Sequence, residues 1–511
     1  MGLELRNALS RRQLLRQAAI GGAGAAAFWG VDVGALVRRS AAAGVREITL
    51  ETREVQWELA PGKIITAMAY NGRVPGPPIR VKEGERLRVV LRNALGEPTT
   101  IHWHGVEVPN AMDGVPGITQ PPVQPRETFV YEFDARPAGT RWYHTHFQEH
   151  HQMDLGLVAP LIIDPAGPEP FPADRDHTLV LDDWATGSGP PLPKTDAGTA
   201  GARGSMGGMM GGMRGMDQGG RGMMGGMMGR GGMGSMMGRS GNEPAYDTMT
   251  INGKAHPATE LMVIERGERI RLRLINGSAE HTHAIRLAGH PLHVTHADGN
   301  PLQAPVEVDM LPIAPAERYD VLVHATRPGA WLLYCMAPGH AEAGEQMMVA
   351  YRGHEHRKPE SPQAGLDGLR LWTYGLGRGR DKASRGSGSV RALEQVLSGG
   401  MMGSQDWSIN GKRYPDTDPI TARRGEVIRL HMRNQSMEAH PMHLHGQSFR
   451  VLAMNGERLV APLVKDTVDV EAHMGSAEIE FAAHNPGDWF FHCHKPMHMD
   501  GGMIALVKIA G

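Results

Sequence analysis

The chain has 511 residues, which is enough for about three domains of ordinary size. Its 53 Lys and Arg nearly balance its 55 Asp and Glu, so bulk charge gives no reason to expect a nucleic-acid or membrane-surface partner. Two cysteines cannot form a disulfide framework, and we therefore expect packing and bound metals to stabilise the fold.

Residues 1–44 are typical of a twin-arginine export signal. Ser10-Arg11-Arg12 opens it, and a weakly apolar run rich in Ala and Gly follows from Ala18 to Val37. This run contains Asp32 and many glycines, so it is a poor candidate for a membrane helix, and we expect no membrane span in the mature chain. The signal predicts a periplasmic or secreted protein that folds before export.

Three internal repeats follow the signal. Each begins at an Asn-Gly pair, at Asn71, Asn252 or Asn410, and alternating apolar residues lead to a second Asn about two dozen residues later. Such alternation, broken by Gly and Pro turns, predicts short strands in sandwiches or barrels. We therefore predict an all-β fold of three cupredoxin-like Greek-key β-sandwich domains. The predicted domains are residues 45–166, 167–356 and 406–511, with a linker at 357–405.

The first repeat carries two His-x-His pairs, His102 with His104 and His144 with His146. Alternate side chains of a strand point to the same face, so each pair presents both imidazoles to one side. Two such pairs on adjacent strands can converge on one metal-binding cavity. For any one pair taken alone, ordinary polar strand residues are the simpler interpretation.

The composition changes sharply within the second predicted domain, in an insertion at residues 187–243. From Gly201 to Gly241 the chain is nearly all Gly, Met, Arg and Ser, with twelve methionines from Met206 to Met237. Such a segment cannot pack a core, which favours a surface loop. A neutral flexible insertion is one interpretation. We favour a second interpretation, in which the methionines of this segment bind additional Cu(I) ions, because thioethers are soft ligands that select Cu(I).

The second repeat also contains Cys335 and, five residues later, His340, with His281 and His283 upstream. The third repeat has a Cys and a His at the same spacing, Cys493 and His498, which are candidate copper ligands. One hypothesis is therefore that Cys335 and His340 belong to a second mononuclear copper site. Glu345 stands where the third repeat has a methionine ten residues after the Cys. We therefore favour a relic of duplication, with a buried thiol that packs as a small hydrophobe.

The stretch from Phe491 to Met503 contains a thiolate, three imidazoles and thioethers within thirteen residues. A thiolate with imidazoles and a weak axial thioether makes a blue-copper electron-transfer site, for which Cys493, His498 and Met503 are candidates. If Cys493 lies on a strand, its neighbours His492 and His494 point to the opposite face. We therefore expect Cys493 to connect the thiolate site to a second metal centre.

A further cluster, His440, His443 and His445, completes four motifs that stand in order along the chain. With them the sequence resembles the multicopper oxidases, which include laccases and bacterial copper-tolerance oxidases. The resemblance covers nearly the whole exported chain and implies four Cu per chain, one type 1, one type 2 and two type 3. The implied ligands are His440, Cys493, His498 and Met503 for type 1, His102 and His443 for type 2, and His104, His144, His146, His445, His492 and His494 for type 3.

The resemblance also implies the reaction, in which four one-electron oxidations of a substrate are coupled to the reduction of O2 to water. Electrons are expected to enter through His498, whose imidazole is expected near the surface, and to continue through Cys493. Asp113 falls where relatives keep a carboxylate beside the trinuclear cluster, which implies proton supply. A turn-forming Asp before Gly114 is the alternative interpretation.

The reductant admits several hypotheses. Oxidation of Cu(I) in copper tolerance is favoured by the methionine-rich insertion and by Met437 and Glu438 just before His440. A laccase that oxidises phenols is the competing hypothesis. A copper-binding protein without turnover ranks last, because every ligand of the family pattern is present.

Overall fold

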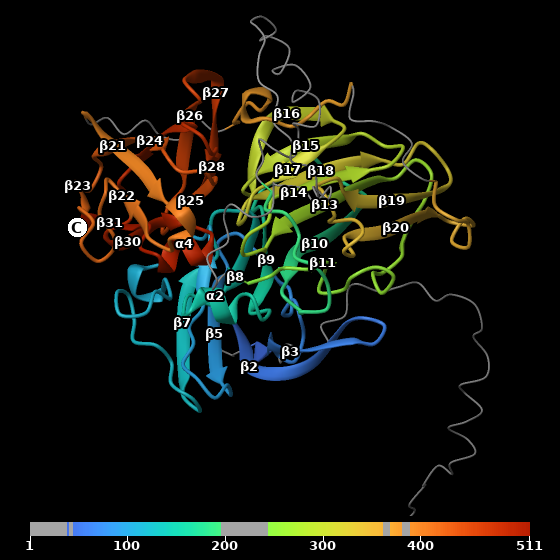
Figure 1. The fold of residues 1–511 in the computed structure, drawn as a ribbon, viewed down its shortest axis with the longest axis horizontal. Helices are drawn as coiled ribbons and strands as arrows, with labels where there is room; N and C mark the ends of the chain where they lie inside the picture. The colour runs from blue at the N-terminus through green and yellow to red at the C-terminus, as the bar shows by residue number, and fades with distance from the viewer. Residues whose placement is uncertain (1–37, 40–43, 196–243, 361–367, 381–388) are drawn as a thin grey trace, which may run out of the picture. The chain divides into compact units, whose positions relative to one another are not determined.

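The computed structural model describes residues 38–39, 44–195, 244–360, 368–380 and 389–511 (Figure 1). Most of the predicted export signal and most of the methionine-rich insertion lie outside the described residues. The rest confirms the predicted all-β fold, because its strands form six sheets. Among the described residues, no helix is long and apolar enough to cross a membrane.

Two sheets come from the N-terminal third of the chain. One has the order β1-β2-β5-β7, with β3 paired to β2, and the other has the order β4-β9-β8-β6. The elements are β1 Arg38–Arg39, β2 Val45–Ala60, β3 Lys63–Tyr70, β4 Ile79–Lys82, β5 Arg86–Asn93, β6 His102–His104, η1 Asn110–Met112, β7 Thr128–Asp134, β8 Gly139–His144, α2 Glu149–Gln152 and β9 Val158–Asp164.

The next two sheets enclose a large apolar core. Their strand orders are β11-β10-β13-β18-β15-β16 and β12-β20-β19-β14-β17. Leu272 and Val294 from one sheet pack in the same buried cluster as Ile285 and Leu333 from the other. The strands are β10 Arg175–Trp184, β11 Thr248–Ile251, β12 Met262–Ile264, β13 Arg269–Asn276, β14 His283–Leu287, β15 Leu292–Ala297, β16 Asn300–Val308, β17 Leu311–Ile313, β18 Arg318–His324, β19 Ala330–Cys335 and β20 Gln346–Tyr351.

The last two sheets repeat the preceding pair strand for strand. Their orders are β22-β21-β24-β29-β26-β27 and β23-β31-β30-β25-β28. The elements are η2 Tyr374–Leu376, β21 Val390–Gly399, η3 Met401–Gly403, β22 Trp407–Ile409, β23 Ile420–Arg423, β24 Val427–Asn434, β25 His440–Leu444, β26 Phe449–Met454, β27 Glu457–Lys465, β28 Thr467–Val470, β29 Ser476–Ala482, β30 Gly487–Cys493, α4 Pro496–Asp500 and β31 Ile504–Ala510.

The asparagines that begin the sequence repeats have a structural cause. Asn71, Asn252 and Asn410 have φ values of 51°, 53° and 53°, and each is followed by a glycine with positive φ. Two successive residues of positive φ make a tight turn between strands, for which Asn-Gly is the preferred pair. The repeated pairs therefore mark equivalent turns in the three repeats.

Part of the range predicted as a linker, residues 357–405, belongs to the sheets. Strand β21 pairs in parallel with β24, and Trp372 is buried in the core of the second pair of sheets. The third pair of sheets therefore begins ahead of residue 406, where the sequence places the third domain. The charged Arg391 and Glu394 and the glycine-rich surroundings hide this strand from pattern analysis.

Candidate metal centres

Eight imidazoles from the first and third pairs of sheets form one buried cluster. In the first pair, β6 runs antiparallel to β8, which places His102 opposite His144. In the third, β25 runs antiparallel to β30, which places His443 opposite His492. The rings of His104 and His443 stack across the two pairs with centroids 3.7 Å apart. The eight side chains, all buried, are His102, His104, His144, His146, His443, His445, His492 and His494.

The imidazole nitrogens of this cluster fit metal ions. His102, His144 and His443 each donate a hydrogen bond from Nδ1 to a backbone carbonyl, at 2.7 to 2.9 Å, and leave Nε2 inside the cluster. Six of the eight residues have at least one buried ring nitrogen without a hydrogen-bond partner among the described residues. An unsatisfied buried group costs about 1–3 kcal/mol, so six such imidazoles in one cluster indicate that their free nitrogens bind metal ions. Several triplets of these imidazoles have nitrogens within 4.8 Å of one another.

The electrostatics of the cluster keep seven of its imidazoles neutral, those of His104, His144, His146, His443, His445, His492 and His494. Burial, with added repulsion from His445 and other neighbouring imidazoles, holds the pKa of His443 well below its ordinary value. Burial also lowers the pKa of His492 to about 4. Neutral imidazole is the form that binds metals, so the cluster is ready to bind ions at neutral pH.

Asp113 contacts the outer edge of the cluster. Its buried carboxylate accepts a hydrogen bond from Nδ1 of His445 at 2.8 Å, and its Oδ1 lies 3.3 Å from Nδ1 of His102. The loop approaches β6 closely because Gly114 has a φ of 86°, and a Cβ there would lie 1.9 Å from the Ile101 carbonyl oxygen. The side chain of Asp113 therefore orients the imidazole of His445, and its backbone carbonyl orients that of His102.

Asp466 is a functional residue that the sequence analysis missed. Its backbone carbonyl accepts a hydrogen bond from Nδ1 of His443 at 2.7 Å, and Oδ1 lies 3.1 Å from Nε2 of His104. Arg318 donates to both carboxylate oxygens at 2.6 Å, and Arg141 donates at 3.4 Å. Burial alone would raise the pKa of Asp466, but Arg318 and Arg141 lower it. The residue therefore supports the cluster as an anion.

A second centre lies on the other side of β30. The thiol sulfur of Cys493 is 3.6 Å from Nδ1 of His440 and 3.5 Å from Nδ1 of His498, and these two nitrogens are 3.0 Å apart. Met503 is buried, and its carbonyl accepts a hydrogen bond from the amide of Cys493 at 3.1 Å. Cys493 thus faces this centre, whereas His492 and His494 face the imidazole cluster, as the alternation of a strand requires.

The expectation that His498 lies near the surface needs correction. Its imidazole is only 1% exposed, because the indole of Trp407 covers it with ring centroids 3.8 Å apart. Its Nε2 lies 3.3 Å from a carboxylate oxygen of Glu438. Glu438 in turn accepts hydrogen bonds from Lys194 at 3.0 Å, and its side chain is 18% exposed. Glu438 therefore connects the buried Cys493 centre with the solvent.

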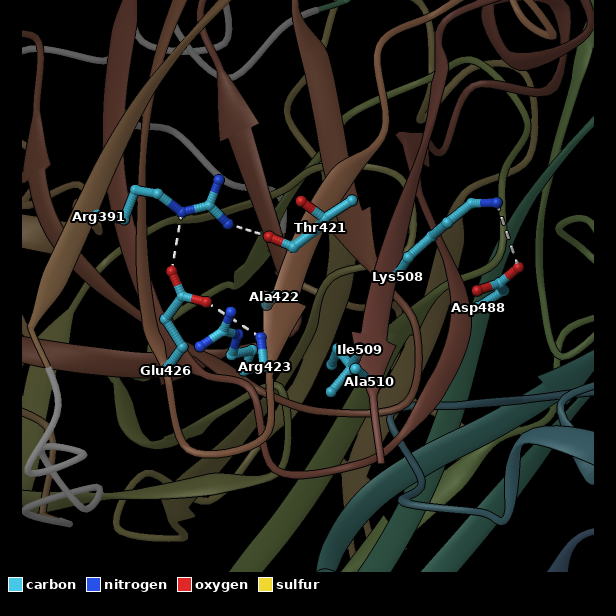
Figure 2. A pocket seen from close by; sticks show the side chains of 9 residues that line it. All are labelled: Arg391, Thr421, Ala422, Arg423, Glu426, Asp488, Lys508, Ile509 and Ala510. Carbon is cyan, nitrogen blue, oxygen red and sulfur yellow. Dashed lines mark hydrogen bonds and ion pairs between the residues drawn. The ribbon is translucent and has the colours of Figure 1, made fainter.

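A surface hollow elsewhere on the third pair of sheets has no part in these centres (Figure 2). Its volume is about 450 Å³, and it lies between β21, β23 and β31. Arg391 pairs with Glu426 across it, and Lys508 pairs with Asp488. No His, Cys or Met lines the hollow, so it offers nothing to a soft metal ion.

Comparison with known proteins follows the same division of the chain. Models of the multicopper oxidase family match residues 51–167, 228–355 and 389–510. Multicopper oxidase MmcO of Mycobacterium tuberculosis is 33% identical over 86% of this chain and 83% of its own length. Copper resistance protein A of Escherichia coli is 28% identical over 98% and 99%. Laccase-4 of Thanatephorus cucumeris is 28% identical over 90% and 88%.

A solved structure agrees with these relatives. The crystal structure of a multicopper oxidase from Pseudomonas thermotolerans superposes with a TM-score of 0.66 at 25% identity, and the match covers 91% of this chain and 99% of that one. Three cupredoxin domains with buried imidazole and thiolate clusters define a copper-dependent oxidoreductase. The chain belongs to the multicopper oxidase family, and it is an enzyme that reduces O2 with electrons from a reductant.

Proposed function

We propose that the protein is a cuprous oxidase that is exported to the periplasm or beyond and protects against copper. It would couple four one-electron oxidations of Cu(I) to the reduction of O2 to water. The carboxylate of Glu438 carries the proposal, because it is partly exposed and only 3.3 Å from Nε2 of the buried His498. A cation that reaches Glu438 is then separated from the thiolate centre by a single imidazole.

Lys194 indicates where such a cation would bind. Its ammonium group lies 3.0 Å from Glu438 and 3.9 Å from Glu280, and the ammonium group of Lys495 lies 2.8 Å from Glu280, so the two carboxylates hold two positive charges there. We propose that Cu(I) takes the place of the Lys194 ammonium group. Lys194 lies close in the chain to the methionine-rich segment, whose thioethers would supply Cu(I).

The space beside these residues suits an ion better than an aromatic ring. A small hollow is lined by Leu192, Lys194, Pro244, Tyr246, Glu280, His281 and Met497. Its volume is about 10 Å³, which is room for about one water-sized particle. Met497 adds a thioether at this position. The name of the relative in Escherichia coli, copper resistance protein A, also supports a role in protection against copper.

We assign four coppers to the clustered side chains. Bound copper supplies one-electron transfer and the reduction of O2. The protein holds neutral imidazoles at fixed positions, excludes water from them, and places the Asp113 carboxylate where it can hold a proton beside His102 and His445. The proposed ligands are His440, Cys493, His498 and Met503 for type 1, His102 and His443 for type 2, and His104, His144, His146, His445, His492 and His494 for type 3.

A laccase that acts on phenols is the second candidate, favoured by the likeness to laccase-4 of Thanatephorus cucumeris. Two substitutions with opposite effects on charge distinguish a cuprous oxidase from a laccase. In Glu438→Gln the Cu(I) concentration for half-maximal O2 uptake should rise about tenfold, the equivalent of about 1.4 kcal/mol, because an anionic contact is lost. In Lys194→Gln it should fall, because one of the two competing ammonium groups is gone.

Oxidation of a neutral phenol by the same variants serves as the control, since a phenol gains little from either charge. Changes of equal size for Cu(I) and phenol in both variants would contradict a cation site at Glu438. A large effect on phenol alone would favour the laccase.

A further inference from the structure

The second pair of sheets contains a buried set of side chains that the proposed oxidase reaction does not use. His283, Cys335, His340 and Glu345 are each at most 1% exposed. Each offers one ligand atom, and the four atoms lie within 4.8 Å of one another. They come from the start of β14, the end of β19 and the turn before β20, so they converge from separate strands of one sheet.

The backbone around this set repeats the backbone of the thiolate centre in the third pair of sheets. Cys335 lies opposite Ile285 of β14, as Cys493 lies opposite Met442 of β25. The amide of Cys335 donates a hydrogen bond to the carbonyl of Glu345 at 3.1 Å. The amide of Cys493 makes the same bond, also 3.1 Å long, to Met503. Glu345 therefore occupies the position of the predicted axial methionine.

The histidines correspond in the same way. Nε2 of His283 lies 2.7 Å from the hydroxyl of Ser278, and Nε2 of His440 lies 2.8 Å from the hydroxyl of Ser436. His283 is thus the counterpart of His440. The other upstream histidine, His281, is held by Asp183 at 2.8 Å and is not a member of the set.

The candidate ligand atoms of the four side chains in this set lie close to one another. The sulfur of Cys335 is 3.3 Å from Nδ1 of His340, which is 3.2 Å from Oε2 of Glu345. Nδ1 of His283 is 2.7 Å from Oε1 of Glu345, yet neither atom forms a hydrogen bond of acceptable geometry. Two buried polar atoms that are close but misaligned for a hydrogen bond are arranged as ligands around a common point.

The surroundings of the sulfur favour a thiolate when a cation is present. The backbone amides of Ala284 and Ala337 donate to the Cys335 sulfur at 3.1 and 3.4 Å. A thiolate and a carboxylate together carry two negative charges, and the two imidazoles are neutral ligands. A divalent ion would leave the buried site neutral, whereas Cu(I) would leave one uncompensated negative charge, which is costly in a dry interior.

We propose that His283, Cys335, His340 and Glu345 form an additional mononuclear metal site for a divalent late transition ion, Zn²⁺ or Cu²⁺. Four protein ligands of the Cys, His and carboxylate types make a closed tetrahedral site of the kind that zinc takes. Imidazole and thiolate also suit Cu²⁺. This proposal takes the hypothesis of a metal site in place of the relic of duplication that the sequence analysis favours.

The additional site is not connected to the imidazole cluster. In the third pair of sheets Cys493 is flanked by His492 and His494, but Cys335 is flanked by Tyr334 and Met336. No imidazole therefore follows or precedes this sulfur on its strand. We expect the ion to hold β14, β19 and the turn before β20 together rather than to carry electrons.

The decisive experiment removes the other thiolate and leaves Cys335 untouched. In Cys493→Ser, purified as the full exported chain, Cys335 is the only cysteine, so any short metal–thiolate distance must come from this site. X-ray absorption at the zinc and copper edges should show one sulfur ligand at about 2.3 Å, and the edge identifies the ion. At the copper edge a methionine thioether also gives a sulfur distance, so the control is the double variant Cys493→Ser/Cys335→Ser, which keeps every methionine and should lose the signal of this site. The absence of this distance at both edges would overturn the proposal.

A second measurement counts metal ions per chain in variants of the site. Cys335→Ser and His340→Gln should each contain one ion fewer than the wild type, with the blue absorption of the Cys493 centre unchanged. Glu345→Met recreates the ligand set of the third pair of sheets, and when it is loaded with copper it should gain a second blue absorption. Equal metal content in the wild type and both depleted variants would contradict the assignment.

Discussion

Cys493 ends strand β30 with its sulfur on one side and the imidazoles of its two chain neighbours on the other. The same three residues therefore serve two centres without any intervening side chain. This arrangement was predictable from the sequence, because it depends only on the alternation of a strand and on a Cys between two His.

Substitution of the sulfur should separate the two centres. Cys493→Ser should abolish the blue absorption and the steady-state oxidation of every reductant, while the imidazole cluster keeps its copper. Visible spectra, copper content and O2 uptake are the measurements. His102→Ala is the matched control, and it should keep the blue absorption but lose O2 uptake. Turnover that persists in Cys493→Ser with any reductant would contradict the division into two centres.

Asp113 is predicted to act on the reduction of O2 rather than on folding. In Asp113→Asn, kcat should fall by about 10² to 10⁴, the usual contribution of one positioned proton donor, with copper content unchanged. The amide keeps a hydrogen-bonding oxygen for His445 but cannot hold an exchangeable carboxyl proton. Rates measured under saturating reductant test this. An unchanged kcat would mean that the residue serves only the turn and the orientation of the imidazoles.

At the scale of elements, sequence patterns located the turns and the ligand strands but not strand β21. Asn-Gly pairs define turns because of their backbone conformation, which is a local property. Strand β21 is recognised by its pairing with β24 and β22, and its own residues alternate weakly between glycine-rich flanks. Pairing with distant strands therefore determines the structure of β21, and the local sequence pattern does not indicate such pairing.

The methionine-rich segment should matter for Cu(I) and not for phenols. Deletion of residues 201–241 should raise the Cu(I) concentration for half-maximal rate, because transient thioether binding no longer concentrates the ion. Phenol oxidation should be unchanged or faster. The fold should survive, since a Gly-rich segment without a core contributes little apolar burial. A matched variant that keeps the length but changes the twelve methionines to serine tests the thioethers alone.

Equal kinetics for Cu(I) in the wild type, the deletion and the serine variant would remove this support for a copper-tolerance role. Slower kinetics in the deletion alone would assign the effect to the length of the segment rather than to its sulfur.

At the scale of the whole molecule, Asp466 links all three pairs of sheets. Its carboxylate receives hydrogen bonds from Arg141 of β8 and Arg318 of β18, which lie 325 and 148 residues away in the chain. Its chain neighbours include no histidine that would mark a ligand site. The sequence could not indicate this residue, because its role depends on three segments that meet only in the folded protein.

Asp466→Asn should lower the free energy of unfolding by about 3–5 kcal/mol, because Arg318 then loses its main counter-charge in a buried position. Thermal or denaturant unfolding of the purified protein measures this. Glu265→Gln is the matched control, since Glu265 pairs with Arg352 at the surface and both side chains are more than half exposed. The control should change stability by less than about 1 kcal/mol. Similar losses in the two variants would contradict a buried ionic link.

The most direct test of a cuprous oxidase is O2 uptake by the fully copper-loaded enzyme with Cu(I) as the only reductant, compared with a phenol under the same conditions. Reduction of one O2 to water consumes four electrons, so the account predicts saturable uptake with four Cu(I) oxidised per O2. It also predicts a higher kcat/KM for Cu(I) than for the phenol, and a loss of that preference in Glu438→Gln. Cu(I) oxidation no faster than the spontaneous reaction, together with rapid oxidation of the phenol, would contradict it.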